Sequence, residues 1–282
     1  MPLLIDLLAF LPLAIAAPDP SWVSARDALV LDAGDSKLRG WEVSDDWRQR
    51  VLAMDVRAWQ NDRATAMLAW SAAPSAYRGA LFRFGDPRLH TPAAAGPLLA
   101  RLAWGGDGEP VRIALAEAIV HTGGDWAEAV ILMLPDEQSV AVRKVLVEDG
   151  RVAPPPFAAA LVAAGFADEA TSVRAAAART APWVTPTSAV APRLLAALSD
   201  ADADVRSEAA RSVGLLDVEG AWRPLVSLLA DSDARVRLQA LKALQRLDAV
   251  NAATLPQMES LRNDTDGRVQ RAAAGGSGSS GE

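Results

Sequence analysis

The side chains that could perform catalysis are few in this chain. There is no cysteine, and neither of the two histidines, His90 and His121, has a second histidine at the helical spacing of metal ligands. The run Gly105–Gly108 lacks the Lys-Ser/Thr that completes a phosphate-binding loop. We therefore expect a protein without catalytic activity, metal or cofactor, whose charged residues act by binding.

Many of the charged residues follow a fixed period. An apolar residue followed by Arg, or once by Gln, occurs eight times at intervals of 30 to 34 residues. The eight dipeptides are Trp47-Arg48, Tyr77-Arg78, Val111-Arg112, Val142-Arg143, Val173-Arg174, Val205-Arg206, Val236-Arg237 and Val269-Gln270. Such a period indicates stacked supersecondary units rather than one globular core.

Composition predicts what these units are made of. Hydrophobic residues make up 51% of the 282 residues, Ala and Leu are abundant, and β-branched runs bounded by turn residues are scarce. We therefore predict an all-α fold class. The formal net charge of -7 opposes the general attraction of proteins to phosphate backbones, so no nucleic acid is expected as a partner.

Three copies between residues 189 and 274 show the unit most clearly. Each has an apolar first helix with a proline near its start, an Asp-rich turn, and a second helix that opens with the periodic dipeptide. Carboxylates of the turn are placed to cap the second helix. The second helix carries alanines toward its neighbour, and in one copy Gly214 lies where that helix can end.

The pattern Pro-Leu-x-x-Leu-Leu, an Asp-rich turn and Val-Arg-x-x-Ala-x-x-Ala-Leu resembles the short bacterial type of HEAT repeat. This resemblance implies a right-handed α-solenoid of about eight antiparallel helix pairs, with a concave surface lined by the second helices. The resemblance is strong over residues 189–274, fair over 97–181 and weak in the first two units.

The resemblance also implies that the Asp of a turn and the Arg of a dipeptide bond between neighbouring units. We call these arginines the Arg ladder, and its members are Arg48, Arg78, Arg112, Arg143, Arg174, Arg206 and Arg237. Gln270 interrupts the ladder in the last unit, which is expected of an end repeat without a further neighbour.

A second set of charges stands five residues after the ladder in six consecutive units. We call it the charged column, and it consists of Arg83, Glu117, Glu148, Arg179, Arg211 and Lys242. Its position lies off the apolar stripe of the helix, so we expect these side chains to be exposed. They form either an ordinary solvated face or a groove, acidic in the middle and basic in its C-terminal half, for an elongated protein or peptide.

Tryptophan is unusually frequent in the first quarter of the chain. Five of the nine tryptophans gather there, namely Trp22, Trp41, Trp47, Trp59 and Trp70. Large rings can fill the irregular end of a stack, whereas exposed members such as Trp59 or Trp70 could anchor a partner. The sequence leaves both interpretations open. Trp126 and Trp222 belong to first helices and are predicted to be packing residues.

The sequence divides into three parts. Residues 1–16 are predicted to be a signal peptide, because the apolar stretch 7–17 ends in a small-x-small pattern, although no Lys or Arg precedes it. Residues 17–274 form the predicted HEAT-like solenoid, with its clearest repeats at 97–274, and residues 275–282 a flexible Gly/Ser tail. We expect an exported protein, periplasmic or secreted. The alternative is a cytoplasmic protein whose apolar first segment caps the solenoid.

These features predict a noncatalytic scaffold or adaptor that presents an extended concave surface to a protein or peptide partner. No stretch reaches the roughly 20 apolar residues of a membrane span. Two other functions fit the same pattern. One is a regulatory or lyase-type accessory subunit of an enzyme, and the other is a structural component of the cell envelope.

Overall fold

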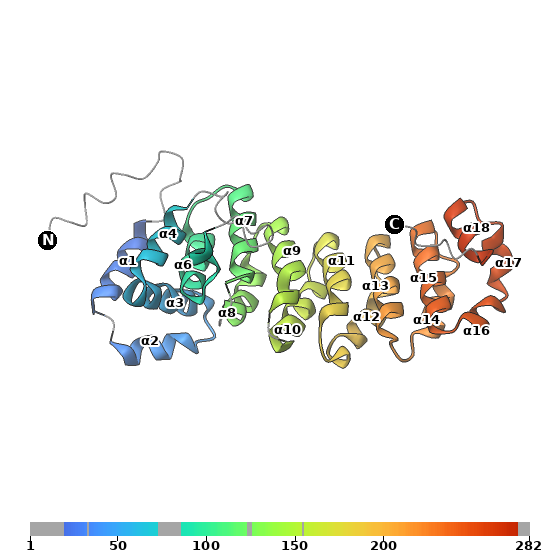
Figure 1. The fold of residues 1–282 in the computed structure, drawn as a ribbon, viewed down its shortest axis with the longest axis horizontal. Coiled ribbons are helices and arrows are strands. Elements are labelled where there is room, and N and C mark those ends of the chain that lie inside the picture. The colour runs from blue at the N-terminus through green and yellow to red at the C-terminus, as the bar shows by residue number, and fades with distance from the viewer. Residues whose placement is uncertain (1–19, 33, 73–85, 123–125, 154, 276–282) are drawn as a thin grey trace. The chain divides into compact units, whose positions relative to one another are not determined.

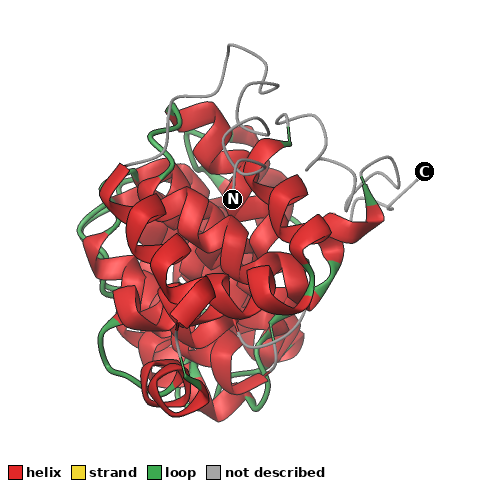
Figure 2. Cartoon of the chain, turned by 90° about the vertical axis from the view of Figure 1, so that its left-hand side faces the viewer, coloured by secondary structure: helices red, strands yellow, loops and turns green. Residues whose placement is uncertain are grey.

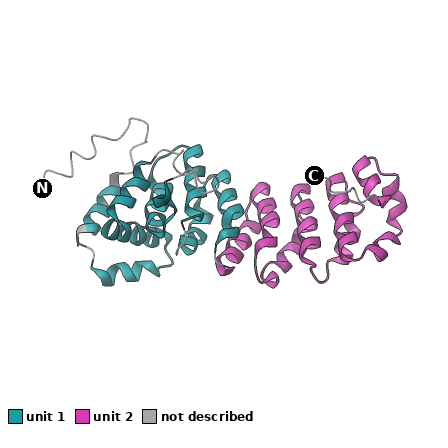
Figure 3. Ribbon diagram, in the orientation of Figure 1, with its two compact units in different colours: residues 1–153 teal, residues 154–282 magenta. Residues whose placement is uncertain are grey.

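The computed structural model describes residues 20–32, 34–72, 86–122, 126–153 and 155–275. Among these residues the regular elements are α-helices and short 3-10 helices, and no strand is present (Figure 2). The predicted all-α fold class is therefore confirmed. The chain divides into two compact units, Met1–Ala153 and Pro154–Glu282 (Figure 3). The predicted signal peptide and the tail beyond Gly275 lie outside the described residues.

Unit 2 is built from helix pairs that follow one another along the chain (Figure 1). Its first helices are α10 (Pro155–Phe166), α12 (Ala191–Ala197), α14 (Trp222–Leu228) and α17 (Gln257–Arg262). Its second helices are α11 (Thr171–Thr180), α13 (Ala203–Leu216), α15 (Ala234–Leu247) and α18 (Gly267–Ala273). The connections contain η6 (Ala181–Trp183), η7 (Thr187–Ala189) and α16 (Ala249–Ala253).

Unit 1 begins irregularly and ends in the same paired arrangement. Its elements are α1 (Pro20–Asp32), α2 (Asp35–Glu42), α3 (Trp47–Asn61), α4 (Arg63–Ser71), η3 (Pro87–His90), α6 (Pro92–Trp104), α7 (Glu109–Val120), α8 (Trp126–Met133), η4 (Leu134–Asp136), α9 (Val140–Asp149) and η5 (Gly150–Val152). Helix α3 contacts α1, α2, α4 and α6, so the first part of the unit is organised around one helix. Helix α6 pairs with α7, and α7 packs against α9.

The periodic dipeptides occupy one helical position in both units. Val205 and Arg206 are the third and fourth residues of α13, and the corresponding dipeptides hold the same places in α7, α9, α11, α15 and α18. Trp47 and Arg48 differ, because they are the first and second residues of α3. The period therefore places six dipeptides at the same position in their helices, and Trp47-Arg48 departs from this position.

Aspartates at the turns fix where the second helices begin. The Asp202 side chain accepts hydrogen bonds from the backbone N–H groups of Asp204 and Val205, and Asp233 and Asp266 cap α15 and α18 in the same way. These carboxylates satisfy donors that have no partner inside the helix and suit the positive end of its dipole. The predicted capping by the Asp-rich turns is confirmed.

Close packing of second helices determines the role of Gly214. This residue lies inside α13, and a Cβ atom on it would stand 2.7 Å from both the Cα and the Cβ atoms of Ala243 in α15. The prediction that Gly214 ends its helix is wrong, because α13 continues to Leu216 and Asp217 adopts the left-handed conformation (φ 50°) that follows. Glycine is required here by the approach of two helices.

We expect Gly214→Ala to lower the free energy of unfolding by about 1–3 kcal/mol, because the added methyl group meets the α15 backbone. Gly267→Ala is the matched control, since its Cβ would touch only the flexible end of Arg271, at 3.4 Å. The control should be neutral or slightly stabilising. Urea unfolding followed by circular dichroism measures both. A Gly214→Ala variant as stable as the wild type would contradict the close approach of α13 and α15.

Candidate functional site

The Arg ladder joins each turn of unit 2 to the next. Arg206 donates from Nη1 to the carbonyl oxygens of Asp200 and Ala201 in its own turn, at 2.8 and 2.9 Å. Its Nε and Nη2 atoms donate to the two carboxylate oxygens of Asp231 in the following turn, at 2.7 and 2.9 Å. One guanidinium therefore closes its own turn and holds the next, through the forked geometry that arginine offers to carboxylates.

The same arrangement recurs on both sides of Arg206. Arg174 binds the carbonyl oxygens of Asp168 and Glu169 and both carboxylate oxygens of Asp200, at 2.8 to 3.1 Å. Arg237 binds the carbonyl oxygens of Asp231 and Ser232 and both carboxylate oxygens of Asp264, at 2.6 to 3.1 Å. The predicted bonding between the Arg of one repeat and the Asp of its neighbour is thus found three times in this unit.

Each ladder aspartate also shapes its own turn. Asp231 accepts from the backbone N–H of Asp233 at 2.9 Å, and Asp233 is the residue that caps α15. The Asp231 side chain is only 8% exposed, so the guanidinium of Arg206 is what balances its buried charge. One continuous series of hydrogen bonds therefore links the contact between two repeats to the cap of the following helix.

Unit 1 uses a glutamate where unit 2 uses aspartate. Arg112 donates to the Glu137 carboxylate at 2.6 Å, and the same carboxylate accepts from the Ser139 N–H at 2.8 Å. Arg143, which is 6% exposed, donates to the carbonyl oxygens of Glu137 and Gln138 at 2.8 and 3.3 Å. The longer side chain of Glu137 thus fills the place of the ladder aspartate.

The two ends of the predicted ladder differ from its middle. Arg48 does not belong to the ladder, because it is the second residue of its helix and not the fourth. Its side chain is exposed and lies 3.3 Å from Asp136, which belongs to a non-neighbouring turn. Gln270 keeps half of the interaction, since its amide donates to the Asp264 carbonyl oxygen at 2.7 Å. A glutamine has no fork with which to reach a further carboxylate. Arg78 lies outside the described residues.

The charged column is less exposed than predicted. Arg179 and Lys242 are exposed, whereas Glu117, Glu148 and Arg211 are half-buried, and Arg83 lies outside the described residues. The prediction of exposure is wrong for those three, because other side chains of the same unit partly cover them. Glu148, for example, is 3.8 Å from Lys144.

In unit 2 one carboxylate binds two residues of the charged column. Arg179 on α11 and Arg211 on α13 donate to the two oxygens of Glu208, at 3.1 and 3.2 Å. Lys242 on α15 makes no ion pair with a described residue. The sequence analysis missed Glu208, although its position three residues before Arg211 on a helix was a signal for that pair.

Two of the N-terminal tryptophans, Trp59 and Trp70, pack inside unit 1, whereas the Trp22 side chain lies outside what the structure describes. The Arg26 guanidinium lies 4.4 Å from the Trp59 ring centre and 5.4 Å from that of Trp70. Both indole N–H groups donate to the buried Asp55 carboxylate, at 3.0 and 3.4 Å. These contacts favour the packing interpretation for Trp59 and Trp70 over that of exposed anchors.

Other tryptophans divide between packing and exposure. Trp47 stacks on Trp104 with ring centres 5.4 Å apart. Trp126 is 1% exposed, as predicted for a packing residue, and Trp222 is half-buried. Trp183, which the sequence analysis did not single out, is 55% exposed.

The two histidines differ in their surroundings. Burial lowers the pKa of His90, and the nearby His121 acts in the same direction, so His90 is neutral at pH 7. His121 Nδ1 lies 2.7 Å from the Glu117 carbonyl oxygen, to which it donates.

In the part of the chain that the structure describes, no group of three or more His, Cys, Asp or Glu side chains could hold a metal ion. No described helix is both long and apolar enough to cross a membrane.

The model of the HEAT repeat family matches residues 190–276, the segment that contains α12 to α18. Residues 190–276 are HEAT repeats. In these repeats the family pattern and the Arg ladder coincide, because Arg206 and Arg237 bind Asp231 and Asp264 inside the matched segment. The predicted resemblance is confirmed there.

Solved structures of repeat proteins are similar to the chain at low identity. The X-ray structure of Escherichia coli YibA is 14% identical with a TM-score of 0.45, covering 91% of this chain and 96% of that one. An engineered protein is 18% identical with a TM-score of 0.40, covering 84% and 92%. A designed armadillo repeat protein in complex with the peptide (KR)4 is 19% identical with a TM-score of 0.37, covering 84% and 95%. No curated protein matches the chain in sequence.

Outside the HEAT repeats, one further ion pair was missed by sequence reasoning. Arg101, on the first helix α6, is 2% exposed and binds both oxygens of Asp107 at 2.8 and 3.1 Å. It also donates to the Ala72 carbonyl oxygen at 2.9 Å. An arginine inside an otherwise apolar helix, six residues before an aspartate, was the available signal.

We expect Arg206→Ala to lower the free energy of unfolding by about 2–4 kcal/mol, because the nearly buried Asp231 carboxylate loses its cation and two carbonyl oxygens lose their donor. Arg206→Gln should cost less, since Gln270 shows that an amide keeps a carbonyl contact. The exposed Arg223 is the control, and Arg223→Ala should stay within about 0.5 kcal/mol. Equal losses at positions 206 and 223, measured by urea unfolding, would refute the structural role of the ladder.

Acid should weaken the HEAT repeats. The hydrogen bond from Arg174 lowers the pKa of Asp200, and that from Arg235 lowers the pKa of Asp233 to about 2. Because both pKa values lie below the ordinary 3.8, the carboxylates contribute stability that is complete above about pH 5 and is lost as the pH falls through the lowered pKa values. We expect Asp200→Asn to flatten this acid dependence in urea unfolding series. An unchanged slope would show that Asp200 does not contribute to it.

Proposed function

We propose that this protein is a noncatalytic scaffold that binds protein partners through the exposed face of its second helices in unit 2. The fold is a repeat scaffold of a kind commonly used for protein binding. The observation that carries the proposal is the separation of two sets of charges on the same helices. Ladder arginines bind the aspartates of the turns, whereas the charged column lies one turn farther along the same helices, where Arg179 pairs with Glu208 of the next repeat at the surface.

The balance of charge on this face favours an acidic partner surface. Arg179, Arg211 and Lys242 supply three positive charges, and Glu208 supplies the negative charge that two of them share. The face is therefore basic on a chain whose net charge is -7. Opposite charge on a partner would raise the rate of encounter and fix the register of binding.

The helix packing supports the use of this face as a surface. Within unit 2, α11 packs on α13, α13 on α15 and α15 on α18, while contacts among the first helices are sparser. Small residues such as Ala210 and Gly214 allow this closeness. Side chains of successive second helices are thus brought close enough to act together on one ligand, as Arg179 and Arg211 do on Glu208.

Support for a noncatalytic role comes from the chemistry of the polar groups. The buried charges described above are each engaged in capping, ladder contacts or core packing. Export of the protein also stays a proposal, based on the small-x-small pattern at residues 14–16.

A charge-reversal experiment tests the proposed binding face. Partners captured by cross-linking in the native host are purified, and their affinity is measured by biolayer interferometry. We expect the double variant Arg179→Glu and Arg211→Glu to weaken the affinity for a genuine partner by roughly tenfold or more, because the basic face becomes acidic and repels an acidic partner surface. The thermal midpoint should change little, since the ladder is untouched.

The matched control is Arg193→Glu with Arg223→Glu. These exposed arginines lie on the first helices α12 and α14, and their reversal changes the net charge by the same amount. The control should keep the affinity of the wild type. Undiminished affinity in the Arg179 and Arg211 variant would show that the second-helix face is not the binding surface.

A further inference from the structure

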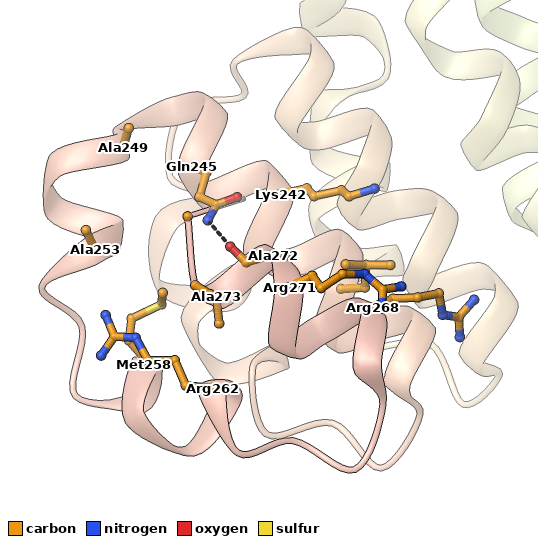
Figure 4. Close-up of a pocket in the computed structure, with 13 residues that line it drawn as sticks. Lys242, Gln245, Ala249, Ala253, Met258, Arg262, Arg268, Arg271, Ala272 and Ala273 are labelled. Carbon is orange, nitrogen blue, oxygen red and sulfur yellow. Dashed lines mark hydrogen bonds between the residues drawn. The ribbon is translucent and has the colours of Figure 1, made fainter. Parts of the chain in front are cut away.

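The last helices of unit 2 enclose an open hollow of about 750 Å³ (Figure 4). Residues of α15, α16, α17 and α18 line it. Leu238 and Met258, which are 8% and 4% exposed, contribute an apolar floor. Gln245 donates to the Ala272 carbonyl oxygen at 3.0 Å and thereby ties α15 to α18 beside the hollow.

The charged side chains that line this hollow are all basic. They are Lys242, Arg262, Arg268 and Arg271. Arg268 is bound to the Asp266 carboxylate at 2.8 and 3.1 Å. The other three are exposed and form no ion pair with any described residue. Figure 4 shows Lys242, Arg268 and Arg271 extending in the same direction, with Arg262 beside Met258.

Folding accounts for only part of this charge. Arg262 and Arg271 lie in the last turns of α17 and α18, where a cation suits the negative end of the helix dipole. Lys242 lies in the middle of α15 and has no such benefit. Elsewhere in unit 2 the ladder arginines are matched with aspartates, whereas these three cations line one hollow that has no carboxylate in its lining.

We propose that this basic pocket, formed by Lys242, Arg262 and Arg271 over Leu238 and Met258, binds an acidic peptide segment of a partner protein. Carboxylates of the segment would meet the unmatched cations, and an aliphatic side chain of the segment would enter the hollow. The inference deepens the proposed function, on which it rests only in taking a protein as the ligand. It assigns a site that shares only Lys242 with the proposed binding face, and it assigns the chemistry of the ligand.

The pocket fits a peptide better than a nucleic acid. No described residue that lines it is aromatic, so bases would find no ring on which to stack. The chain has a net charge of -7, which repels a polyphosphate at long range but tolerates a short segment with a few carboxylates. The apolar floor offers a place for an aliphatic side chain beside the charges.

Fluorescence anisotropy on the full chain tests the proposal. The probe is a short fluorescein-labelled peptide of alternating Glu and Leu, and comparison peptides carry Gln or Lys in place of Glu. We expect binding of the Glu peptide that weakens as salt is raised, with much weaker binding of the Gln peptide and none of the Lys peptide. A single-stranded DNA of equal charge should bind less tightly than the Glu peptide.

The variant Arg262→Glu with Arg271→Glu should weaken the Glu peptide by roughly tenfold or more, and Lys242→Gln should have a smaller effect. Arg193→Glu with Arg223→Glu again changes the net charge equally and should keep the affinity. Circular dichroism and thermal melting establish that each variant is folded. The Lys242→Gln variant, which removes no helix-end charge, keeps the test decisive if the double variant fails to fold.

Three results would overturn the proposal. One is equal weakening by the pocket variant and the control, which would mean that binding is nonspecific. Another is tighter binding of the DNA than of the peptide. The third is self-association of the chain, seen by sedimentation velocity and abolished by Arg262→Glu with Arg271→Glu, which would assign the pocket to a second copy. Neither Arg179 nor Arg211 is altered here, so failure of this test leaves the proposed binding face to its own experiment.

Discussion

The repeat architecture of this protein depends on a forked contact in which arginine binds its own turn and the next. The guanidinium of Arg206 gives one terminal nitrogen to two backbone carbonyl groups and its other donors to the Asp231 carboxylate. A lysine ammonium, which has three donors on one atom, could not span both sets. The fork also sets the period, because the carboxylate follows its arginine by 25 to 27 residues and precedes the next ladder position by six.

Two parts of the described chain show what replaces this contact where it is absent. At Gln270 the amide keeps the carbonyl bond but has no fork with which to hold a carboxylate as well. The first part of unit 1 is assembled differently, around α3, where Arg26 and Asp55 are enclosed by Trp59 and Trp70. Large rings cover the buried charges there, so packing replaces the ladder as the source of order.

The sequence predicted those features that repeat along the chain and missed those that depend on a single contact. The period placed Val205-Arg206 and its equivalents at one helical position, and the Asp-rich turns identified the caps, because both follow from local chemistry. Gly214 was misread as a helix end, since only the distance to Ala243 reveals why it is glycine. The exposure of the charged column was overestimated for the same reason. Helical periodicity describes one helix alone, whereas Arg211 and Glu208 also lie near the neighbouring helix.

Arginine therefore has two roles in unit 2, contact between repeats and surface charge, and the surroundings of each arginine decide which role it has. The Arg206 side chain is 15% exposed and bound at both ends, so replacing it alters the contact between repeats. The Arg179 side chain is 44% exposed on the same layer of helices, and its ion pair with Glu208 lies at the surface, where such pairs add little to stability. Substitutions at the charged column and the basic pocket can consequently change what the surface binds while the ladder keeps the repeats in register. Under the proposed mode of binding, ligand preference and fold stability are separable, because they rest on different arginines.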